Sequence, residues 1–254
     1  MAVDQKFYAF KNLMLRYAAS QRVDFKSWMV YDHFYPVANN CQVKGLSKIY
    51  ESIFGKTTEG LFVEVGAFDG QNYSNTAGLA DIGWRGLYIE PILESAMNCT
   101  TRHRDNNCLI VNQAVGAESG LLKLVFGNGM EGAFTTSDPE MMAKLTEHLG
   151  MEYEAEMVTL DTVLQQNGIE PSFELLVIDI EGYEENLFKA FDIDYYLPRM
   201  MIVELCDIHP EFVGTEIAKS AARVRDYIVA KNYQLIYGDN VNSVFVLESL
   251  LGDD

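Results

Sequence analysis

The stretch LFVEVGAFDG, residues 61–70, decides the fold class of this chain. Its apolar first half, interrupted only by Glu64, is typical of a strand that is buried on both faces of a parallel sheet. Gly66 and Gly70 then bound a short turn, and glycine permits both a positive φ and close approach of the backbone to a ligand. We therefore interpret the stretch as a strand that leads into a ligand-binding loop, with an ordinary glycine turn as the alternative.

The composition fits one large α/β domain and disfavours nucleic acid as a partner. A chain of 254 residues can bury a sizeable single core. Its 19 Lys and Arg residues against 37 Asp and Glu residues give a net charge of −18, which repels phosphates. The four cysteines lack CxxC spacing, so the sequence indicates neither a zinc site nor a disulfide framework.

The sequence also predicts a cytoplasmic protein without a membrane span. Its N-terminal stretch MAVDQKFYAFKNLMLRY has no continuous apolar segment followed by a small-residue cleavage site, as a signal peptide would have. No stretch approaches the roughly 20 apolar residues that cross a bilayer. No pattern in the sequence indicates an oligomeric state.

Strand-like apolar runs alternate with helical patterns from residue 61 onward, which predicts a parallel sheet with helices on both faces. The predicted strands are 61–65, 86–90, 108–112, 121–126, 155–160, 174–182, 200–206, 233–238 and 243–249. The predicted helices are 4–19, 46–54, 74–82, 93–101, 141–149, 162–166, 184–190 and 218–231. The glycine-rich stretch 127–140 is interpreted as a mobile loop, and the aromatic residues of 20–44 either line a substrate pocket or pack this segment onto the core.

The end of the chain specifies the topology. The last two predicted strands are separated only by residues 239–242, which is too short for a parallel crossover and therefore makes the pair antiparallel. A mostly parallel sheet with such a terminal hairpin resembles that of class I methyltransferases that depend on S-adenosylmethionine (SAM). We expect a Rossmann-like, seven-stranded sheet in a methyltransferase domain at 58–254, preceded by a helical extension at 1–57 that packs on it.

Acidic residues follow the strands at the edge where open α/β sheets bind ligands. Glu90 ends the second strand, 20 residues after Gly70, which is the spacing at which a carboxylate accepts hydrogen bonds from the hydroxyls of a ribose. NAD would require GxGxxG, whereas the loop GAFDG lacks the middle glycine and carries Asp69, which would repel a phosphate. SAM has no phosphate and carries a sulfonium cation, so charge and spacing both favour SAM over NAD.

The sequence resembles the FkbM-type methyltransferases. The matching segments are FVEVGAFDGQNYSNT (62–76), GWRGLYIEP (83–91), NQAVG (112–116), TLDTVL (159–164), LLVIDIEGYE (175–184) and IVELC (202–206). The resemblance implies SAM-dependent O-methylation of a hydroxyl on a small acceptor, such as a sugar, a glycan or a secondary metabolite. It implies cofactor contacts at Glu64, Gly66, Ala67, Asp69 and Gly70, with Glu90 on the ribose and Gln113 or Ala114 beside the adenine. The first loop departs from the DxGxNxG version by having Glu64 and Asp69.

An alcohol must lose a proton when it is methylated, which requires a base, a metal ion or both. Asp179 and Glu181 are the candidate catalytic residues, because alternate residues at a strand end can direct both carboxylates into one cleft; Asp179 also counts among the cofactor contacts. Their alternative role is to stabilise the first turn of the next helix. His209 is a further candidate base, or else an ordinary loop residue.

Two further assignments stay open at the level of the sequence. Asn75 either faces the methionine moiety of the cofactor or the substrate, or it belongs to the N-terminal cap of a helix. Asn72 or Ser74 could provide that cap equally well. A divalent metal held by Asp179, Asp207 and His209 would suit oxygen ligands, but no repeated ligand spacing supports it. The alternatives to the leading function are a methyltransferase for an amine or an RNA ribose, and a catalytically silent binding module.

Overall fold

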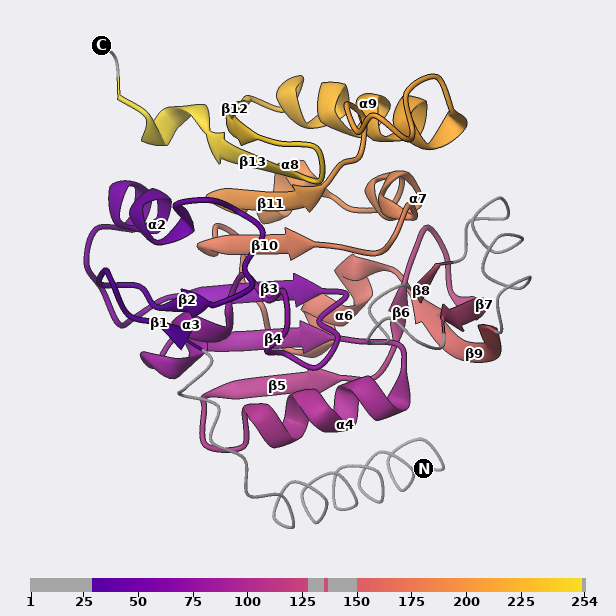
Figure 1. Ribbon diagram of the computed structural model, residues 1–254, viewed down its shortest axis with the longest axis horizontal. Helices are drawn as coiled ribbons and strands as arrows, with labels where there is room; N and C mark the ends of the chain where they lie inside the picture. Colours follow the sequence, from indigo (N-terminus) through magenta and orange to yellow (C-terminus); the bar gives the residue numbers. More distant parts are fainter. Residues whose placement is uncertain (1–28, 128–134, 137–149, 253–254) are drawn as a thin grey trace. The chain divides into compact units, whose positions relative to one another are not determined.

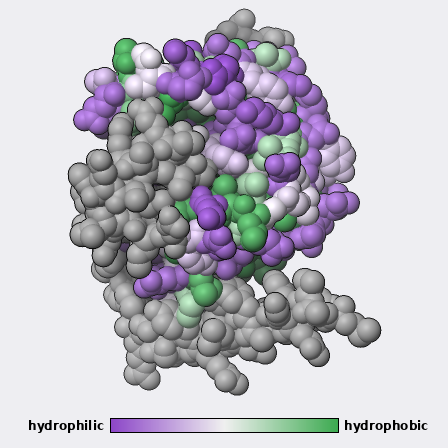
Figure 2. Space-filling view, turned by 90° about the vertical axis from the view of Figure 1, so that its right-hand side faces the viewer, coloured by the Kyte–Doolittle hydropathy of each residue, from purple (hydrophilic) through white to green (hydrophobic). Residues whose placement is uncertain are grey.

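The computed structural model describes residues 29–127, 135–136 and 150–252, which divide into two compact units. The first unit comprises described residues 29–60 and 67–112, and the second comprises 61–66 and the described residues from 113 onward. None of the helices in these described ranges is long and apolar enough to cross a membrane. Hydrophilic side chains cover much of the described surface in the view of Figure 2, as the acidic composition leads one to expect.

The first unit contains a parallel β-α-β arrangement. Strands β4 (Arg85–Ile89) and β5 (Cys108–Val111) pair in parallel and are connected by α4 (Leu93–Arg102) (Figure 1). The unit also contains α2 (Leu46–Phe54), α3 (Ala77–Asp81) and a hairpin of β1 (Met29–Val30) with β2 (Val37–Ala38). The predicted helix 74–82 is therefore shorter, because the Ser74 hydroxyl accepts hydrogen bonds from the N–H groups of Thr76 and Ala77 and so precedes the first helical turn.

The segment before α2 packs onto the first unit through aromatic and backbone contacts. Tyr35 is fully buried, and its ring makes edge contacts with those of Tyr50 and Trp84. A Cβ added to Gly78 of α3 would lie 1.6 Å from the carbonyl oxygen of Pro36, so only glycine lets this segment approach so closely. For Tyr35, the structure thus supports the packing interpretation rather than a pocket lining.

The second unit contains five strands that belong to one sheet. Strands β3 (Leu61–Val65), β10 (Leu175–Ile178) and β11 (Met200–Glu204) are parallel, with β10 in the middle. The four residues of β10 are each at most 1% exposed, as a strand covered on both faces requires. The terminal hairpin is confirmed: β13 (Asn242–Leu247) runs antiparallel to both β11 and β12 (Tyr233–Gly238).

Two helices of the second unit begin at a threonine whose side chain caps the first turn. The Thr159 hydroxyl accepts a hydrogen bond from Thr162 N–H and starts α6 (Leu160–Gln166), and Thr215 does the same for α9 (Glu216–Val229). Both helices therefore begin two residues earlier than predicted. The remaining helices are α7 (Glu184–Phe188), α8 (Ile193–Tyr196) and the 3-10 turn η2 (Glu248–Leu250).

A separate four-stranded sheet, β6-β9-β7-β8, was not predicted. Its strands are β6 (Ala114–Val115), β7 (Gly120–Gly127), β8 (Thr135–Thr136) and β9 (Gly150–Val158). Part of the predicted loop 127–140 is therefore strand, because residues 135–136 pair with β7. The rest of that loop, except Gly127, and the predicted helices 4–19 and 141–149 lie outside the described residues.

The seven strands β12, β13, β11, β10, β3, β4 and β5 are assigned to one mostly parallel sheet. The predicted Rossmann-like α/β fold is confirmed in its strand number and in its antiparallel hairpin. The division into an extension at 1–57 and a domain at 58–254 stays a prediction.

Candidate active site

The predicted ligand loop of the first unit is a tight turn. Gly70 donates its N–H to the carbonyl oxygen of Ala67 at 2.9 Å, and Ala67 donates its own to Ile89 at 3.1 Å. Phe68 and Gly70 have positive φ values of 47° and 70°. Glycine adopts this conformation without a steric penalty, whereas Phe68 must be held in it by its surroundings.

Two carboxylates hold this loop. Asp69 Oδ1 accepts the backbone N–H groups of Gln71 and Asn72 at 2.9 and 2.8 Å. Glu90 is 5% exposed; its Oε2 accepts Phe68 N–H and its Oε1 accepts Ile92 N–H, both at 2.8 Å. These two hydrogen bonds fix the Glu90 side chain directly after β4 and beside the loop.

Two other predicted cofactor residues have close neighbours within the protein. Asn75 is 7% exposed, and its side-chain oxygen lies 3.6 Å from Cys41 Sγ. Its backbone carbonyl accepts a hydrogen bond from the Tyr50 hydroxyl at 2.8 Å. In the second unit, a Cβ on Gly66 would lie 1.6 Å from the carbonyl oxygen of Asp179. The close approach that glycine allows here is thus to the protein backbone.

The remaining predicted cofactor residues belong to strands of the second unit or adjoin them. Glu64 is 4% exposed within β3, opposite Val177 of β10. Ala114 is 3% exposed within β6, opposite Met157 of β9, and Gln113 directly precedes it. Their contacts with a cofactor stay predictions.

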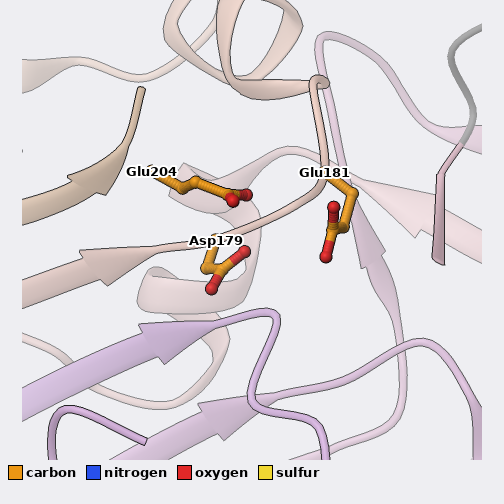
Figure 3. Close-up of side chains that lie close together, drawn as sticks. All are labelled: Asp179, Glu181 and Glu204. Atoms are coloured by element: carbon orange, nitrogen blue, oxygen red, sulfur yellow. The ribbon is translucent and has the colours of Figure 1, made fainter. Parts of the chain in front are cut away.

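Three acidic residues of the second unit form what we call the acidic cluster: Asp179, Glu181 and Glu204 (Figure 3). Ile178 of β10 and Val203 of β11 are in register, so the residues that follow them, Asp179 and Glu204, are neighbours. Glu181 comes from the loop after β10 and has a positive φ of 56°. One carboxylate oxygen from each residue lies within 4.8 Å of the other two.

The acidic cluster binds protons more tightly than ordinary carboxylates do. Burial raises the pKa of Asp179, and a hydrogen bond with the Glu204 side chain acts in the opposite direction. Burial and the charge of Asp179 raise the pKa values of Glu181 and Glu204 well above their usual range. Two carboxyl groups can share a hydrogen bond only if one is protonated. We therefore assign the proton to Glu204 and the negative charge to Asp179.

Two groups beside the acidic cluster were not predicted to take part in the site. Glu184 Oε1 accepts the N–H groups of Ile180 and Gly182 at 3.1 and 3.2 Å, and burial raises the pKa of Glu184 to about 7. Cys206 Sγ lies 4.0 Å from Glu204 Oε1, and burial raises the pKa of the thiol to about 12. The thiol is therefore protonated at neutral pH and is no thiolate nucleophile.

The structure does not bring together the metal set considered from the sequence. Asp207 forms an ion pair with Arg225, and its side chain is 5% exposed. His209 Nδ1 accepts Glu211 N–H at 3.2 Å, and its ring packs on Phe212 at a centroid distance of 5.1 Å. The group of described residues that could hold a cation is the acidic cluster instead. A catalytic role for His209 stays a prediction.

Comparisons with known proteins give one family and several related structures. Residues 64–235 match the family model of the methyltransferase FkbM domain. A comparison with curated proteins gives no match. Among solved structures, the chain resembles a Bacillus cereus O-methyltransferase in complex with SAH, at 12% identity and a TM-score of 0.46 over 97% of each chain. It also resembles Aeropyrum pernix fibrillarin with natively bound S-adenosyl-L-methionine, at 12% identity and a TM-score of 0.41, over 78% of this chain and 70% of that one.

Proposed function

Because the chain belongs to the FkbM methyltransferase domain family and is therefore a SAM-dependent methyltransferase, we propose that it methylates a hydroxyl group of a small acceptor. The acceptor class is a sugar, a glycan or a secondary metabolite. The observation that carries this proposal is the acidic cluster, in which half-buried carboxyl groups with raised pKa values meet at the carboxyl ends of two strands. A raised pKa makes a carboxylate a better acceptor for the proton that a hydroxyl nucleophile must lose.

The residues fit a cationic nucleoside such as SAM. When bound, SAM supplies a methyl group on a sulfonium centre. In the first unit, Glu90 is the proposed ribose acceptor, because two backbone N–H groups fix its carboxylate and carboxylate oxygens accept hydrogen bonds from hydroxyls. The full set of proposed cofactor residues is Glu64, Gly66, Ala67, Asp69, Gly70, Asn75, Glu90, Gln113, Ala114 and Asp179. The acidic residues among them complement a cation and would repel the pyrophosphate of NAD.

Asp179 is the proposed general base. Burial raises its pKa towards the working pH, which makes it a stronger proton acceptor than an exposed aspartate. Glu204, as the protonated partner, donates a hydrogen bond to Asp179 and keeps the carboxylate oriented. The acceptor hydroxyl would transfer its proton to Asp179 as its oxygen bonds to the methyl carbon in place of the sulfur, which would leave as a neutral thioether. Alignment of the two reactants would supply much of the rate. Glu181 and His209 stay candidates for the same task.

A metal-assisted reaction is the second candidate, and it rests on the same three carboxylates. Three oxygen donors within 4.8 Å of one another suit a divalent cation such as Mg²⁺. A cation would lower the pKa of the acceptor hydroxyl directly and would remove the need for a base of raised pKa.

The cytoplasmic location stays a prediction.

A methyl-transfer screen with labelled SAM tests the proposal. The panel should contain sugars, glycans and hydroxylated metabolites, together with amines and RNA, each with EDTA and with added Mg²⁺. We expect transfer to a hydroxylated small molecule and none to RNA. Transfer to amines alone would replace the O-methyl proposal, and activity that EDTA abolishes would favour the metal-assisted mechanism.

Binding of SAM and NAD, measured by calorimetry, tests the cofactor assignment separately. We expect SAM to bind and NAD not to bind. A protein that binds SAM but methylates nothing in a broad screen would point to the silent binding module. No binding of SAM at millimolar concentration would overturn the proposed function.

A further inference from the structure

A group of buried and half-buried polar residues adjoins the ligand loop of the first unit. We call it the loop-support network; its members are Gln71, Asp81, Arg102, His103 and Asn106. Gln71, Arg102 and His103 are 1%, 7% and 2% exposed. Every link described below joins residues of the first unit. Burial of so many polar groups is costly unless each is hydrogen-bonded, so the network is a specific arrangement rather than a solvated surface.

His103 connects the network to the loop. It follows the last residue of α4, and its Nε2 lies 2.8 Å from the carbonyl oxygen of Gly70. Its Nδ1 lies 3.1 Å from Asn106 Nδ2, and the same Asn106 nitrogen donates to Asp81 Oδ1 at 3.0 Å. A carboxylate only accepts, so the Asn106 amide must present its NH₂ to both partners. His103 Nδ1 is therefore the acceptor, and Nε2 carries the proton that is donated to Gly70.

Gly70 packs directly on the end of α4. A Cβ at this position would lie 2.7 Å from Cys99 Sγ and 2.8 Å from His103 Nε2. The φ of 70° at Gly70 also excludes most side chains. The loop thus has no freedom to move towards α4, and the hydrogen bond from His103 prevents the Gly70 carbonyl from turning away.

A second link fixes the residue after the turn. Arg102 Nε donates to Gln71 Oε1, and its two terminal nitrogens hold Asp81 at 2.9 and 2.7 Å. The positive charge of Arg102 is thus compensated by Asp81 within the network. Two consecutive residues at the end of α4 thus hold two consecutive residues of the loop. Arg102 binds Gln71, and His103 binds Gly70.

His103 is uncharged under physiological conditions. Burial, with the neighbouring Arg102 charge, lowers its pKa to about 3. A neutral imidazole of fixed tautomer is a poor base at neutral pH, since its pKa lies far below the working range. Its ring stacks on Tyr88 at 4.4 Å, which fixes its orientation. These properties suit a group that orients the loop rather than one that moves a proton.

We propose that His103 is a positioning residue for SAM: by holding the Gly70 carbonyl, it keeps the loop 67–72 in its binding conformation before the cofactor arrives. The proposal rests on the proposed function, because it assumes that this loop contacts SAM. A preordered loop loses less conformational entropy on binding than a mobile loop does, and this gain appears as affinity. The adjoining Glu90 and Asp69 can then meet the cofactor without rearrangement.

The test compares SAM affinities of purified variants by calorimetry, which requires no knowledge of the acceptor. H103F keeps a ring beside Tyr88 but removes the donor to Gly70, and H103Q restores a donor in its amide. The matched control is Y233F, which removes another buried hydrogen bond to a backbone carbonyl, that of Pro198. We expect H103F to bind SAM about tenfold more weakly, since one lost buried hydrogen bond is worth about 1.4 kcal/mol.

H103Q should recover most of the affinity, and Y233F should match the wild type although its melting temperature falls. Equal SAM affinity of folded H103F and wild type would overturn the inference and leave the proposed function intact. Absence of SAM binding in the wild type itself would overturn both. If H103F does not fold, N106A decides the matter: binding weakened by about threefold supports the inference, and unchanged binding refutes it.

Discussion

The ligand loop and the acidic cluster both depend on carboxyl groups that are shielded from solvent in part or in full, but these groups have different surroundings in the two regions. In the loop, Asp69 and Glu90 accept backbone N–H groups, so their negative charges are already stabilised. In the acidic cluster, Asp179 and Glu204 face each other, and burial raises the pKa values of both. The carboxyl groups of the loop are thus held in place by hydrogen bonds, whereas those of the acidic cluster have raised pKa values.

We infer from this difference that the loop serves cofactor binding and that the acidic cluster serves proton transfer. A carboxylate with satisfied hydrogen bonds keeps its charge and geometry, which suits the recognition of hydroxyls and a cation. A carboxyl group whose pKa is raised by burial takes up a proton more readily, which suits acid–base catalysis. We therefore expect substitutions in the loop to alter SAM affinity and substitutions in the acidic cluster to alter turnover.

The largest expected effect is that of D179N. The amide cannot accept the proton of the acceptor hydroxyl, so kcat should fall by about 10³-fold, and this loss should far exceed the change in the dissociation constant of SAM that removal of one cofactor contact causes. Single-turnover methyl transfer and calorimetry measure the two quantities. D161N is the matched control, because burial raises the pKa of Asp161 too and this residue lies outside the acidic cluster. Full activity of D179N would remove Asp179 from the mechanism.

E90A should act on affinity instead. It removes the acceptor of Phe68 N–H and the proposed partner of the ribose, so SAM should bind roughly 30-fold more weakly, with kcat at saturating SAM little changed. E174A is the matched control, because Glu174 also accepts a backbone N–H, that of Leu61 at 2.9 Å. If E90A and E174A bind SAM equally well, the loop does not contribute the binding that we assign to it.

E184Q should change the pH dependence of stability. The pKa of Glu184 is raised to about 7, so the folded protein binds this proton more tightly than the unfolded chain does. The stabilisation is complete below the unfolded pKa of about 4.5 and is lost as the pH rises through 7. A neutral Gln should retain it, so E184Q should exceed the wild type by about 3 kcal/mol at pH 8 in urea unfolding and match it at pH 4.

The neighbouring Glu185 provides a control of opposite sign. Its hydrogen bond with Arg223 lowers its pKa to about 2. The stabilisation by Glu185 is therefore present above the unfolded pKa and lost as the pH falls towards 2. E185Q should accordingly be less stable than the wild type at pH 8. The prediction for Glu184 fails if both variants shift stability in the same direction.

The smallest expected effect is that of E204Q. If Glu204 is protonated in the active enzyme, a Gln side chain copies it, and kcat at pH 7 should stay within about threefold of the wild type. The rate should also stop declining at high pH, where the wild-type Glu204 would ionise. A loss of a hundredfold or more would instead show that Glu204 acts as a carboxylate, as a metal ligand would.

Much of the fold could be predicted because it depends on local patterns. The apolar run of β10, the glycines that flank α2 and the short connection before β13 each leave a signal within a few residues. The separate sheet could not be predicted in this way. The apolar runs of β7 and β9 identify strands, but which strands pair is determined by contacts between distant segments.

The candidate site shows the same limit. Asp179 was predicted as a candidate base because it follows a buried strand, whereas its partner Glu204 is identified by the register of β10 with β11. His103 and its network carry no motif, since a histidine after a helix is unremarkable in a sequence. Gly66 was predicted to admit a ligand, and its nearest neighbour is the Asp179 carbonyl. Burial and register, which produce the raised pKa values, are properties of the folded chain.

The position of β13 has a consequence for how the protein is made. Strand β12 leaves the ribosome before β13, yet in the described sheet β12 lies at the edge and pairs with β13. During synthesis, neither β11 nor β12 can pair with β13 until residues 242–247 have been made. A nascent chain arrested before these residues would expose two unpaired strand edges, and such edges are targets for chaperones and for aggregation.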